Sequence, residues 1–281
     1  MSKPTFIPKP LTDGVFKHLF GNKRNIRFTE YLLECLLNLN VGSLKNRIVI
    51  KTGLKLDKQG LYKHGFETDI IVVLDEKYVF NLEAYTSFTE YGVYKSFSYL
   101  NTMFTNQFEL GDDLTETKKF IQYNIVKESK YDTKDYGMIS RDAERLELFE
   151  DKRVFLFKII NISKDNSNYS KESQRLFKFL GSNNMDEAKK NSEGDEILME
   201  MYQEANKFIR NNCNNLEVID KLYYEGMKKL ARNEGINEGI SRGLSQGLHT
   251  VASNMLRSGS TKEYVCEVTG LTEKEIEAIK L

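Results

Sequence analysis

Two apolar runs with three charged residues between them place the strongest constraint on the fold of this chain. The runs cover residues 68–74 and 78–84, and Asp75-Glu76-Lys77 separates them within the stretch GFETDIIVVLDEKYVFNLEAY. Short apolar runs on either side of polar turn residues are typical of paired β-strands. We therefore expect a β-hairpin that pairs residue 74 with residue 78, so that the numbers of facing residues add to 152.

This register places Asp69 directly opposite Glu83 on one face of the sheet, with their Cβ atoms about 5 Å apart. The other face is continuous and apolar, and consists of Ile70, Val72, Leu74, Tyr78, Phe80, Leu82 and Ala84. Two like charges on adjacent strands repel each other unless a cation or a proton neutralises them. Carboxylate ligands suit Mg²⁺ or Mn²⁺, which acidify a bound water and neutralise charge on a phosphate. A solvated pair of acids at a sheet edge, each near a lysine, explains the same residues without a metal.

Hydrophobic spacing predicts the elements around the hairpin. We expect helices over 11–39, interrupted at Gly21, and over 88–109, and strands over 47–56, 119–126 and 153–160. Thr12 or Asp13 is suited to cap the first helix. From about residue 170 the chain reads as helical and polar, with a loose stretch over 181–196.

Composition narrows the classes of site that this chain can form. Its 281 residues carry a formal net charge of zero, so a polyanion such as DNA requires a local basic patch. The candidates, which fit a phosphate-binding patch or an ordinary lysine-protected strand edge, are Lys51, Lys55, Lys58 and Lys63. Three histidines and three widely spaced cysteines disfavour imidazole or thiolate metal sites and a disulfide framework. The cysteines fit a reducing cytosol, and the apolar runs stay short of a membrane span, so we expect a cytoplasmic protein.

A glycine repeat marks the last third of the chain. Four glycines recur every four residues, and each precedes an aliphatic residue: Gly235, Gly239, Gly243 and Gly247. A glycine inside a helix costs about 0.5–1 kcal/mol relative to alanine, so close helix–helix packing is expected to offset the cost. We expect this helix to pair two chains in a homodimer. The alternative is a flexible tether of weak helicity.

The final 31 residues, 251–281, read as a small helical unit. The segments beginning at Ser260 and Thr272 both match the capping box S/T-x-x-E, and Gly270 between them predicts a helix end. Two short helices around such a turn have helix-turn-helix geometry. The second helix is as acidic as it is basic, however, which favours an interaction module over a reader of DNA.

An acid, a short hairpin and then Glu-x-(Lys or Gln) resembles the signature of PD-(D/E)XK nucleases. More specifically, the chain resembles the recombination-promoting nuclease/putative transposase family, also called PD-(D/E)XK nuclease family transposases. TDGVFKHLFG at 12–21 is similar to the family's opening D-x-x-F-K-x-L-F-G, and Tyr94-Lys95, Tyr99 and Gly111-Asp112 fall near the spacing of its next helix. EGINEGISRGLSQGL and STKEYVCEVTGLTEKEIEAIK resemble its C-terminal repeat and tail.

The resemblance implies an α/β fold: a restriction-endonuclease-like core of a mixed sheet flanked by helices, with a helical C-terminal extension. It also implies metal-dependent DNA cleavage linked to recombination or mobile elements. On this basis we divide the chain into a nuclease-like core at 1–165, a helical extension at 166–225, the glycine-repeat helix at 226–250 and the tail module at 251–281.

The family pattern assigns roles to individual positions. Asp69 and Glu83 would bind Mg²⁺ or Mn²⁺, with the carbonyl of Ala84 as a further ligand. Asp13 would add a third acid, or would act only as a helix N-cap. Lys17, one turn later, would meet a phosphate or stay in solvent.

The chain departs from the pattern at Tyr85, which stands where the family carries lysine or glutamine. Tyrosine donates a hydrogen bond but brings no positive charge at pH 7. Lys95, at a helical position where the family tends to carry arginine, would supply the charge to the phosphate, or remain a solvated lysine. If neither residue supports catalysis, the chain is a degenerate DNA-binding or regulatory protein that acts through its helical tail.

Overall fold

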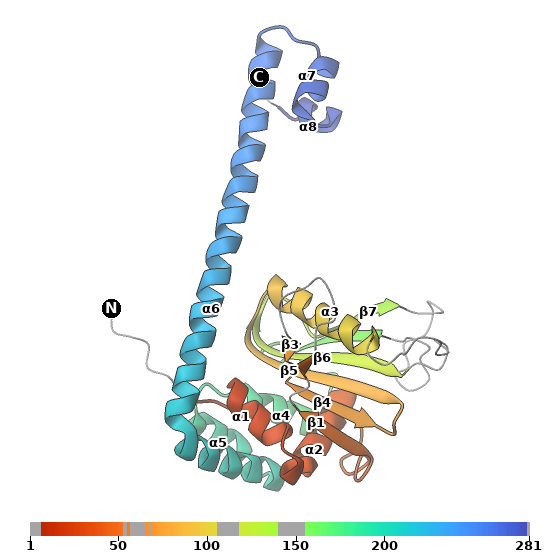
Figure 1. The fold of residues 1–281 in the computed structure, drawn as a ribbon, viewed down its shortest axis with the longest axis vertical. Helices are drawn as coiled ribbons and strands as arrows, with labels where there is room; N and C mark the ends of the chain where they lie inside the picture. Colours follow the sequence, from red (N-terminus) through yellow and green to blue (C-terminus); the bar gives the residue numbers. More distant parts are fainter. Residues whose placement is uncertain are drawn as a thin grey trace. The chain divides into compact units, whose positions relative to one another are not determined.

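The computed structural model describes residues 7–52, 55–56, 66–67, 69–105, 118–139 and 155–279 (Figure 1). The chain forms two compact units, Met1–Glu217 and Val218–Leu281, whose boundary lies inside the long helix α6, Glu196–Arg257. The four segments expected from the sequence remain a prediction, since α6 runs through three of them without interruption.

A mixed sheet of six strands forms the centre of the first unit, in the order β1-β4-β5-β6-β8-β7. The strands are β1 Ile48–Thr52, β4 Ile70–Leu74, β5 Tyr78–Phe88, β6 Lys119–Ser129, β7 Lys134–Ile139 and β8 Phe155–Asn161. Strands β1, β4 and β5 are antiparallel, β5, β6 and β8 are parallel, and β7 is antiparallel to β8. The α/β class and the mixed sheet with flanking helices are therefore confirmed. A restriction-endonuclease-like core remains a prediction.

The hairpin has the expected register. Its pairs run from Ile70 with Leu82 to Leu74 with Tyr78, and each pair adds to 152. Asp75 and Glu76 adopt left-handed φ values of 49° and 58° in the loop, and the Arg47 guanidinium binds the Asp75 carboxylate. The loop is therefore held by an ion pair to the chain just before β1, which stabilises a conformation that is uncommon outside glycine.

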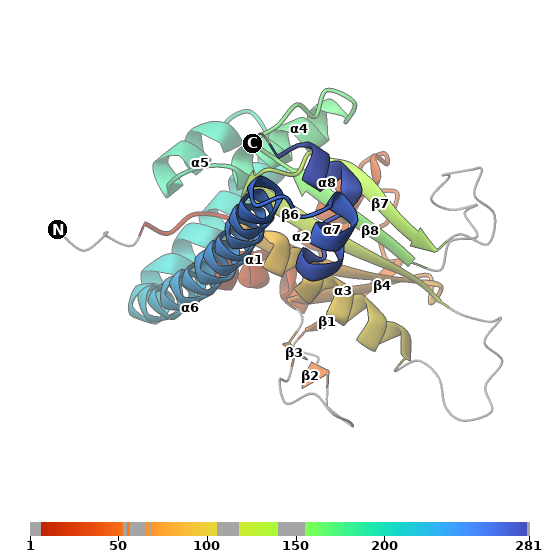
Figure 2. The same cartoon turned by 90° about the horizontal axis from the view of Figure 1, so that it is seen from above.

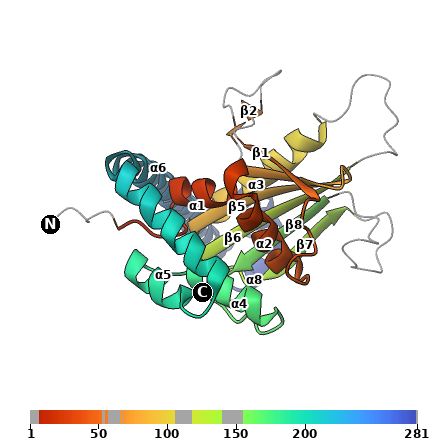
Figure 3. The same ribbon diagram turned by 90° about the horizontal axis from the view of Figure 1, so that it is seen from below.

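Helices cover both faces of the sheet (Figures 1 and 3). One face packs against α1 Asp13–Phe20, α2 Ile26–Leu37, α4 Lys171–Leu180, α5 Met185–Ser192 and the first part of α6. Apolar side chains of the hairpin, including Val72, Phe80 and Leu82, are fully buried in this core. The second face carries α3 Glu90–Thr105, which lies over the sheet in Figure 2. The apolar face predicted for the hairpin is thus the one that forms the main core.

The structure differs from the expected helices and strands at 47–56, at 134–139 and at 181–196. The predicted strand at 47–56 is divided, because β1 belongs to the main sheet whereas β2 Lys55–Leu56 pairs with β3 Phe66–Glu67 in a separate sheet. The alternation of apolar and polar residues continues through both strands and gives no sign of the change. Strand β7 was not expected, since its sequence, KDYGMI, is short and contains a glycine. Its pairing with β8 is irregular after Gly137.

The stretch predicted to be loose, 181–196, contains α5. The Asn184 side chain caps this helix by accepting a hydrogen bond from Glu187 N at 2.8 Å. Ala188 is fully buried in the main core. The buried Ala188, the partly buried Met185 and a good cap thus stabilise a helix whose composition is otherwise polar.

In the second unit, α7 Lys262–Thr269 and α8 Glu273–Glu277 follow the end of α6. Ala252, Val265 and Ile276 form their small buried core. The capping box at Thr272 and the helix end at Gly270, with φ 70°, are confirmed. The cap of α7 is Thr261, one residue later than expected, because its side chain accepts from Tyr264 N.

The four glycines of the repeat lie in regular helix, but the described part of the chain packs nothing against them. Apart from the adjacent residues and the backbone of its own helix, a Cβ at Gly235, Gly239, Gly243 or Gly247 would meet no described atom within 4 Å. The neighbouring side chains of Ile236, Ile240 and Leu244 are 50%, 65% and 64% exposed. The helical alternative is thus favoured over the loose tether, while the packing partner is not found within the described residues. Among those residues, no helix has both the length and the apolar character needed to cross a membrane.

Replacing Gly92 by alanine is expected to lower the free energy of unfolding by about 1–3 kcal/mol, although alanine is the better helix former. A Cβ here would lie 2.6 Å from Cε2 of Phe88, whose ring packs against Tyr85 with centroids 4.8 Å apart. Urea unfolding measures the change. Ser98→Ala on the same helix is the control, expected within about 0.5 kcal/mol of wild type. A more stable Gly92→Ala variant would show that the Phe88 ring moves freely.

Candidate functional site

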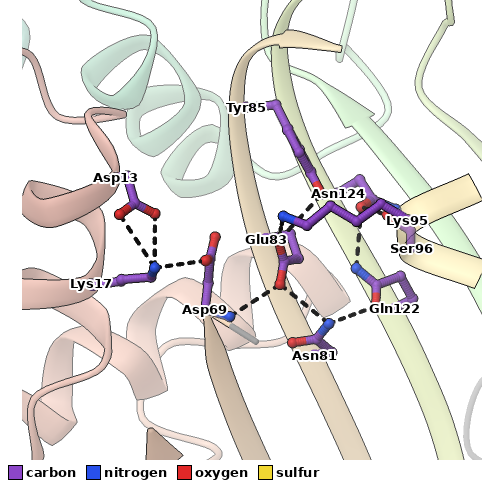
Figure 4. A network of polar contacts seen from close by, with 10 residues as sticks. All are labelled: Asp13, Lys17, Asp69, Asn81, Glu83, Tyr85, Lys95, Ser96, Gln122 and Asn124. Carbon is purple, nitrogen blue, oxygen red and sulfur yellow. Dashed lines mark hydrogen bonds and ion pairs between the residues drawn. The ribbon is translucent and has the colours of Figure 1, made fainter. Parts of the chain in front are cut away.

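The two acids lie together, buried at the open end of the β4–β5 hairpin (Figure 4). Asp69 precedes β4 and is 8% exposed, whereas Glu83, inside β5, has no exposure. The strand pairing ends at Ile70 with Leu82, and the preceding residue, Asp69, donates its backbone N–H to the side-chain oxygen Glu83 Oε1 at 3.0 Å. The alternative of a solvated pair is therefore wrong, although each acid does contact a lysine.

Lys17 links α1 to the acid pair. Its Nζ lies 3.0 Å from Asp69 Oδ1 and 3.0 Å from Asp13 Oδ1. Burial alone would lower the pKa of Lys17, but the charges of Asp69 and Asp13 raise it above its ordinary value. Thr12, not Asp13, occupies the N-cap position of α1, so the interpretation of Asp13 as the cap is wrong. Asp13 instead reaches the acid pair through the shared lysine.

Glu83 receives hydrogen-bond donors on both carboxylate oxygens. Asp69 N and, at 3.5 Å, Asn81 Nδ2 donate to Oε1. Tyr85 Oη and Lys95 Nζ donate to Oε2 at 3.2 Å and 3.4 Å. All four groups are hydrogen-bond donors. Both oxygens of Glu83 therefore have the partners that a carboxylate needs when it is buried away from solvent.

Lys95 approaches Glu83 from α3 between two aromatic rings. Its Nζ lies 5.5 Å from the ring centroid of Tyr85 and 5.1 Å from that of Tyr99. Burial opposes the charge of Lys95, but the negative charge of Glu83 raises its pKa above the ordinary value. The side chain keeps 27% of its exposure, so it reaches both the acid and the solvent. The prediction of a fully solvated lysine is thereby excluded.

Of the predicted site residues, the structure brings together Asp69, Glu83, Tyr85 and Lys95, with Asp13 connected through Lys17. The side chain of Ala84 packs toward the main core, on the opposite face from Glu83. Lys51 is exposed on β1. Lys58, Lys63, Gly111 and Asp112 lie outside the described residues, as does the side chain of Lys55.

A row of buried neutral amides extends the site across the sheet, and the sequence analysis missed it. We call Asn81, Glu83, Ser96, Gln122 and Asn124 the polar strip; all five are fully buried. In the parallel pairing of β5 with β6, Asn81 faces Gln122 and Glu83 faces Asn124. The available signal was the alternation of KFIQYNIV, which puts both β6 amides on one strand face.

The described part of the chain brings no three histidine, cysteine or acidic side chains together as a metal site. The donor set at Asp69 and Glu83 still fits a hard divalent cation, because Mg²⁺ commonly takes only one or two carboxylates and keeps several waters. The two carboxylates supply oxygen ligands side by side, and Asp13 is one lysine away.

A scan against protein-family models, a search of curated proteins and a search of solved structures each returned no match. The resemblance to the nuclease family therefore remains a prediction, and the function has to be argued from the site alone.

Asp69 is expected to make the stability of the fold depend on pH. Burial and then the charge of Glu83 raise the pKa of its carboxyl from 3.8 to about 7, against the opposing effect of Lys17. The folded chain therefore keeps a proton over a range in which the unfolded chain has released it. The resulting stabilisation is present at low pH and is lost as the pH rises toward 7, with a slope of at most about 1.4 kcal/mol per pH unit.

Urea unfolding of wild type and Asp69→Asn between pH 4 and 8 would measure this effect, because asparagine mimics the neutral acid at every pH. The variant should gain stability relative to wild type as the pH rises. Asp75→Asn is the control, since Arg47 lowers the pKa of Asp75, which therefore titrates below this range, and its curve should run nearly parallel to that of wild type. Parallel curves for wild type and Asp69→Asn would contradict the raised pKa.

Proposed function

We propose that this protein is a metal-dependent DNA endonuclease of the recombination-promoting nuclease type, which hydrolyses phosphodiester bonds in the cytoplasm. One observation carries the proposal: Asp69 and Glu83 are buried side by side, and the ammonium group of Lys95 lies 3.4 Å from Glu83. Adjacent carboxylates that can bind a metal ion, next to a partly exposed ammonium group, suit the hydrolysis of a phosphate ester. A role in recombination or in mobile elements belongs to the same proposal.

Asp69 and Glu83 hold the divalent cation, Mg²⁺ or Mn²⁺, with Asp13 and the Ala84 carbonyl as further candidate ligands. When bound, such an ion supplies a more acidic water and neutralises charge on the phosphate. Lys95 donates to the phosphate oxygens as negative charge develops on them. Its two flanking rings hold the ammonium group close to Glu83, which reduces the ordering needed when DNA binds.

Tyr85 has a supporting role in this proposal. Burial raises the pKa of its phenol well above the ordinary value, so the group is a neutral donor. It donates to Glu83 Oε2 and contacts the Lys95 ammonium through its ring. Lys95 thus supplies, from a helix, the positive charge that the family pattern places on the strand at position 85.

A second candidate function is a catalytically degenerate DNA-binding or regulatory protein that acts through its helical tail. The observation in its favour is that Lys17 and Lys95 already pair with the two acids. Such a pair is stable without a metal, and a cation has to compete with both ammonium groups.

Cleavage of supercoiled plasmid in Mg²⁺ or Mn²⁺ distinguishes the two candidates. We expect nicking by the wild type, a loss of about 10²-fold or more in Glu83→Gln, and a comparable loss in Lys95→Met, because each removes a charged group next to the phosphate. Lys130→Met is the matched control. Lys130 follows β6 and pairs with Glu90 of α3, the helix that carries Lys95, and both side chains of this pair are exposed. Folded protein that binds DNA without cutting it would favour the second candidate.

The homodimer belongs to the proposal as well. Four glycines inside α6 cost helix stability, and the described residues provide no contact that offsets the cost. A second copy of the chain offers a matching stripe of glycines and exposed aliphatic side chains, so that two backbones can approach closely. Pairing in this way would bring two sites to one duplex.

Gly239→Ala tests the pairing through the sign of its effect. In an unpaired helix alanine should stabilise by about 0.5–1 kcal/mol, whereas at a close contact between backbones it should weaken the dimer. Light scattering across a concentration series measures the mass of each protein. Ser245→Ala, at an exposed position of α6 on the side away from the glycines, should leave the dimer unchanged. A wild type that is monomeric at micromolar concentration would rule out the pairing.

A further inference from the structure

The polar strip lies inside an otherwise apolar layer between α3 and the sheet. On one side is a cluster that includes Ile71, Val79 and Phe120, and on the other a cluster that includes Phe88 and Val126. Neutral amides buried in such surroundings destabilise a fold unless their hydrogen bonds are made. The strip makes most of these bonds internally, and its amides lead to Glu83, its one acidic member (Figure 4).

The strip has a fixed direction, which is set at Asn124, the last amide reached when the hydrogen bonds are followed from Glu83 through Asn81 and Gln122. The backbone carbonyl of Lys158 can only accept, so Asn124 Nδ2 donates to it, at 3.4 Å. Asn124 Oδ1 then accepts from Gln122 Nε2 at 3.1 Å and from Ser96 Oγ at 2.7 Å. Gln122 Oε1 in turn accepts from Asn81 Nδ2 at 2.7 Å.

Asn81 is the last amide in this series of hydrogen bonds, and its side-chain oxygen lacks a donor among the described residues. Because Asn81 Nδ2 is turned toward Gln122, it also lies 3.5 Å from Glu83 Oε1. Its Oδ1 is buried and has no partner among the described residues. Turning the Asn81 amide over would set its Oδ1 against Gln122 Oε1 and Glu83 Oε1. Gln122 and Asn124 would then have to turn as well, and the Lys158 carbonyl blocks the turn of Asn124. An unpaired buried acceptor costs about 1–3 kcal/mol, so the direction of the strip is kept at the expense of stability.

We infer that Gln122 is a positioning residue for Glu83, which acts through Asn81 and keeps an N–H directed at the carboxylate that binds the cation. This inference rests on the proposed function, because it assigns Glu83 to cation binding. Neither Gln122 nor Asn81 contacts the reacting atoms. The amides that lie behind a ligand fix its orientation, and losing such a partner typically weakens metal binding by about 10–100-fold.

Tb³⁺ titration of the full chain tests the inference without relying on cleavage. The ion binds oxygen ligands and luminesces when a nearby tyrosine absorbs light, and Tyr85 contacts Glu83 in a chain that has no tryptophan. Gln122→Met keeps the length of the side chain but removes both of its hydrogen bonds. We expect it to weaken Tb³⁺ binding by about tenfold or more.

Asn161→Leu is the matched control. Asn161 is also fully buried, and its Nδ2 donates to the carbonyls of Ser129 and Tyr131. We expect it to lose stability but to keep the Tb³⁺ affinity of the wild type. Equal affinity of Gln122→Met and wild type would overturn the inference and leave the proposed function standing. A wild type that does not bind Tb³⁺ would overturn the inference together with the cation site.

If Gln122→Met does not fold, the wild type alone provides the test. Titration with Mg²⁺ should shift the side-chain amide resonances of Asn81 and Gln122 in a ¹⁵N spectrum, while that of Asn161 stays in place. Amides of Asn81 and Gln122 that do not respond to saturating Mg²⁺ would overturn the inference.

Discussion

Glu83 has no exposure to solvent, and a buried carboxylate without partners would cost several kcal/mol. Each element around it therefore contributes a donor. The hairpin partner supplies the Asp69 N–H, β5 itself supplies Asn81 and Tyr85, and α3 supplies Lys95. The positions of β4, β5 and α3 relative to one another are thus tied to the hydrogen bonds of one side chain. The negative charge of Asp69 is less well compensated. Its carboxylate pairs with Lys17, but burial and the nearby charge of Glu83 oppose its ionisation.

One face of the sheet carries the main apolar core, and the other carries the buried polar residues of the candidate site. The face toward α1, α2 and α4 is apolar throughout the hairpin and forms the main core. The face toward α3 is interrupted by the polar strip, which separates two smaller apolar clusters. A fold can carry buried polar groups on one face when the other face supplies most of the hydrophobic stabilisation. The acids therefore lie beside the smaller apolar clusters and leave the main core uninterrupted.

The sequence was sufficient to predict the hairpin, its register and the opposition of Asp69 and Glu83, because the period of a strand and a three-residue loop leave few alternatives. Lys95 was singled out through the resemblance to the nuclease family and not through the strand pattern. The sequence could not place Lys17 between Asp13 and Asp69, since that contact depends on how α1 packs against the sheet. The amides Gln122 and Asn124 were passed over because neutral side chains in an apolar strand carry no charge pattern. Helix α5 was missed for the opposite reason, since Met185 and Ala188 are too weak an apolar signal in a polar stretch.

The polar strip also has a consequence for the docking of α3. A helix with an apolar face can slide along an apolar sheet by one turn, about 5.4 Å, and bury nearly the same area in either place. Here such a slip would separate Ser96 from Asn124 and Lys95 from Glu83, leaving several buried polar groups unpaired. The hydrophobic contacts of α3 thus hold the helix against the sheet but do not fix its position along it. The hydrogen bonds of the strip select one of the positions that apolar packing alone would allow.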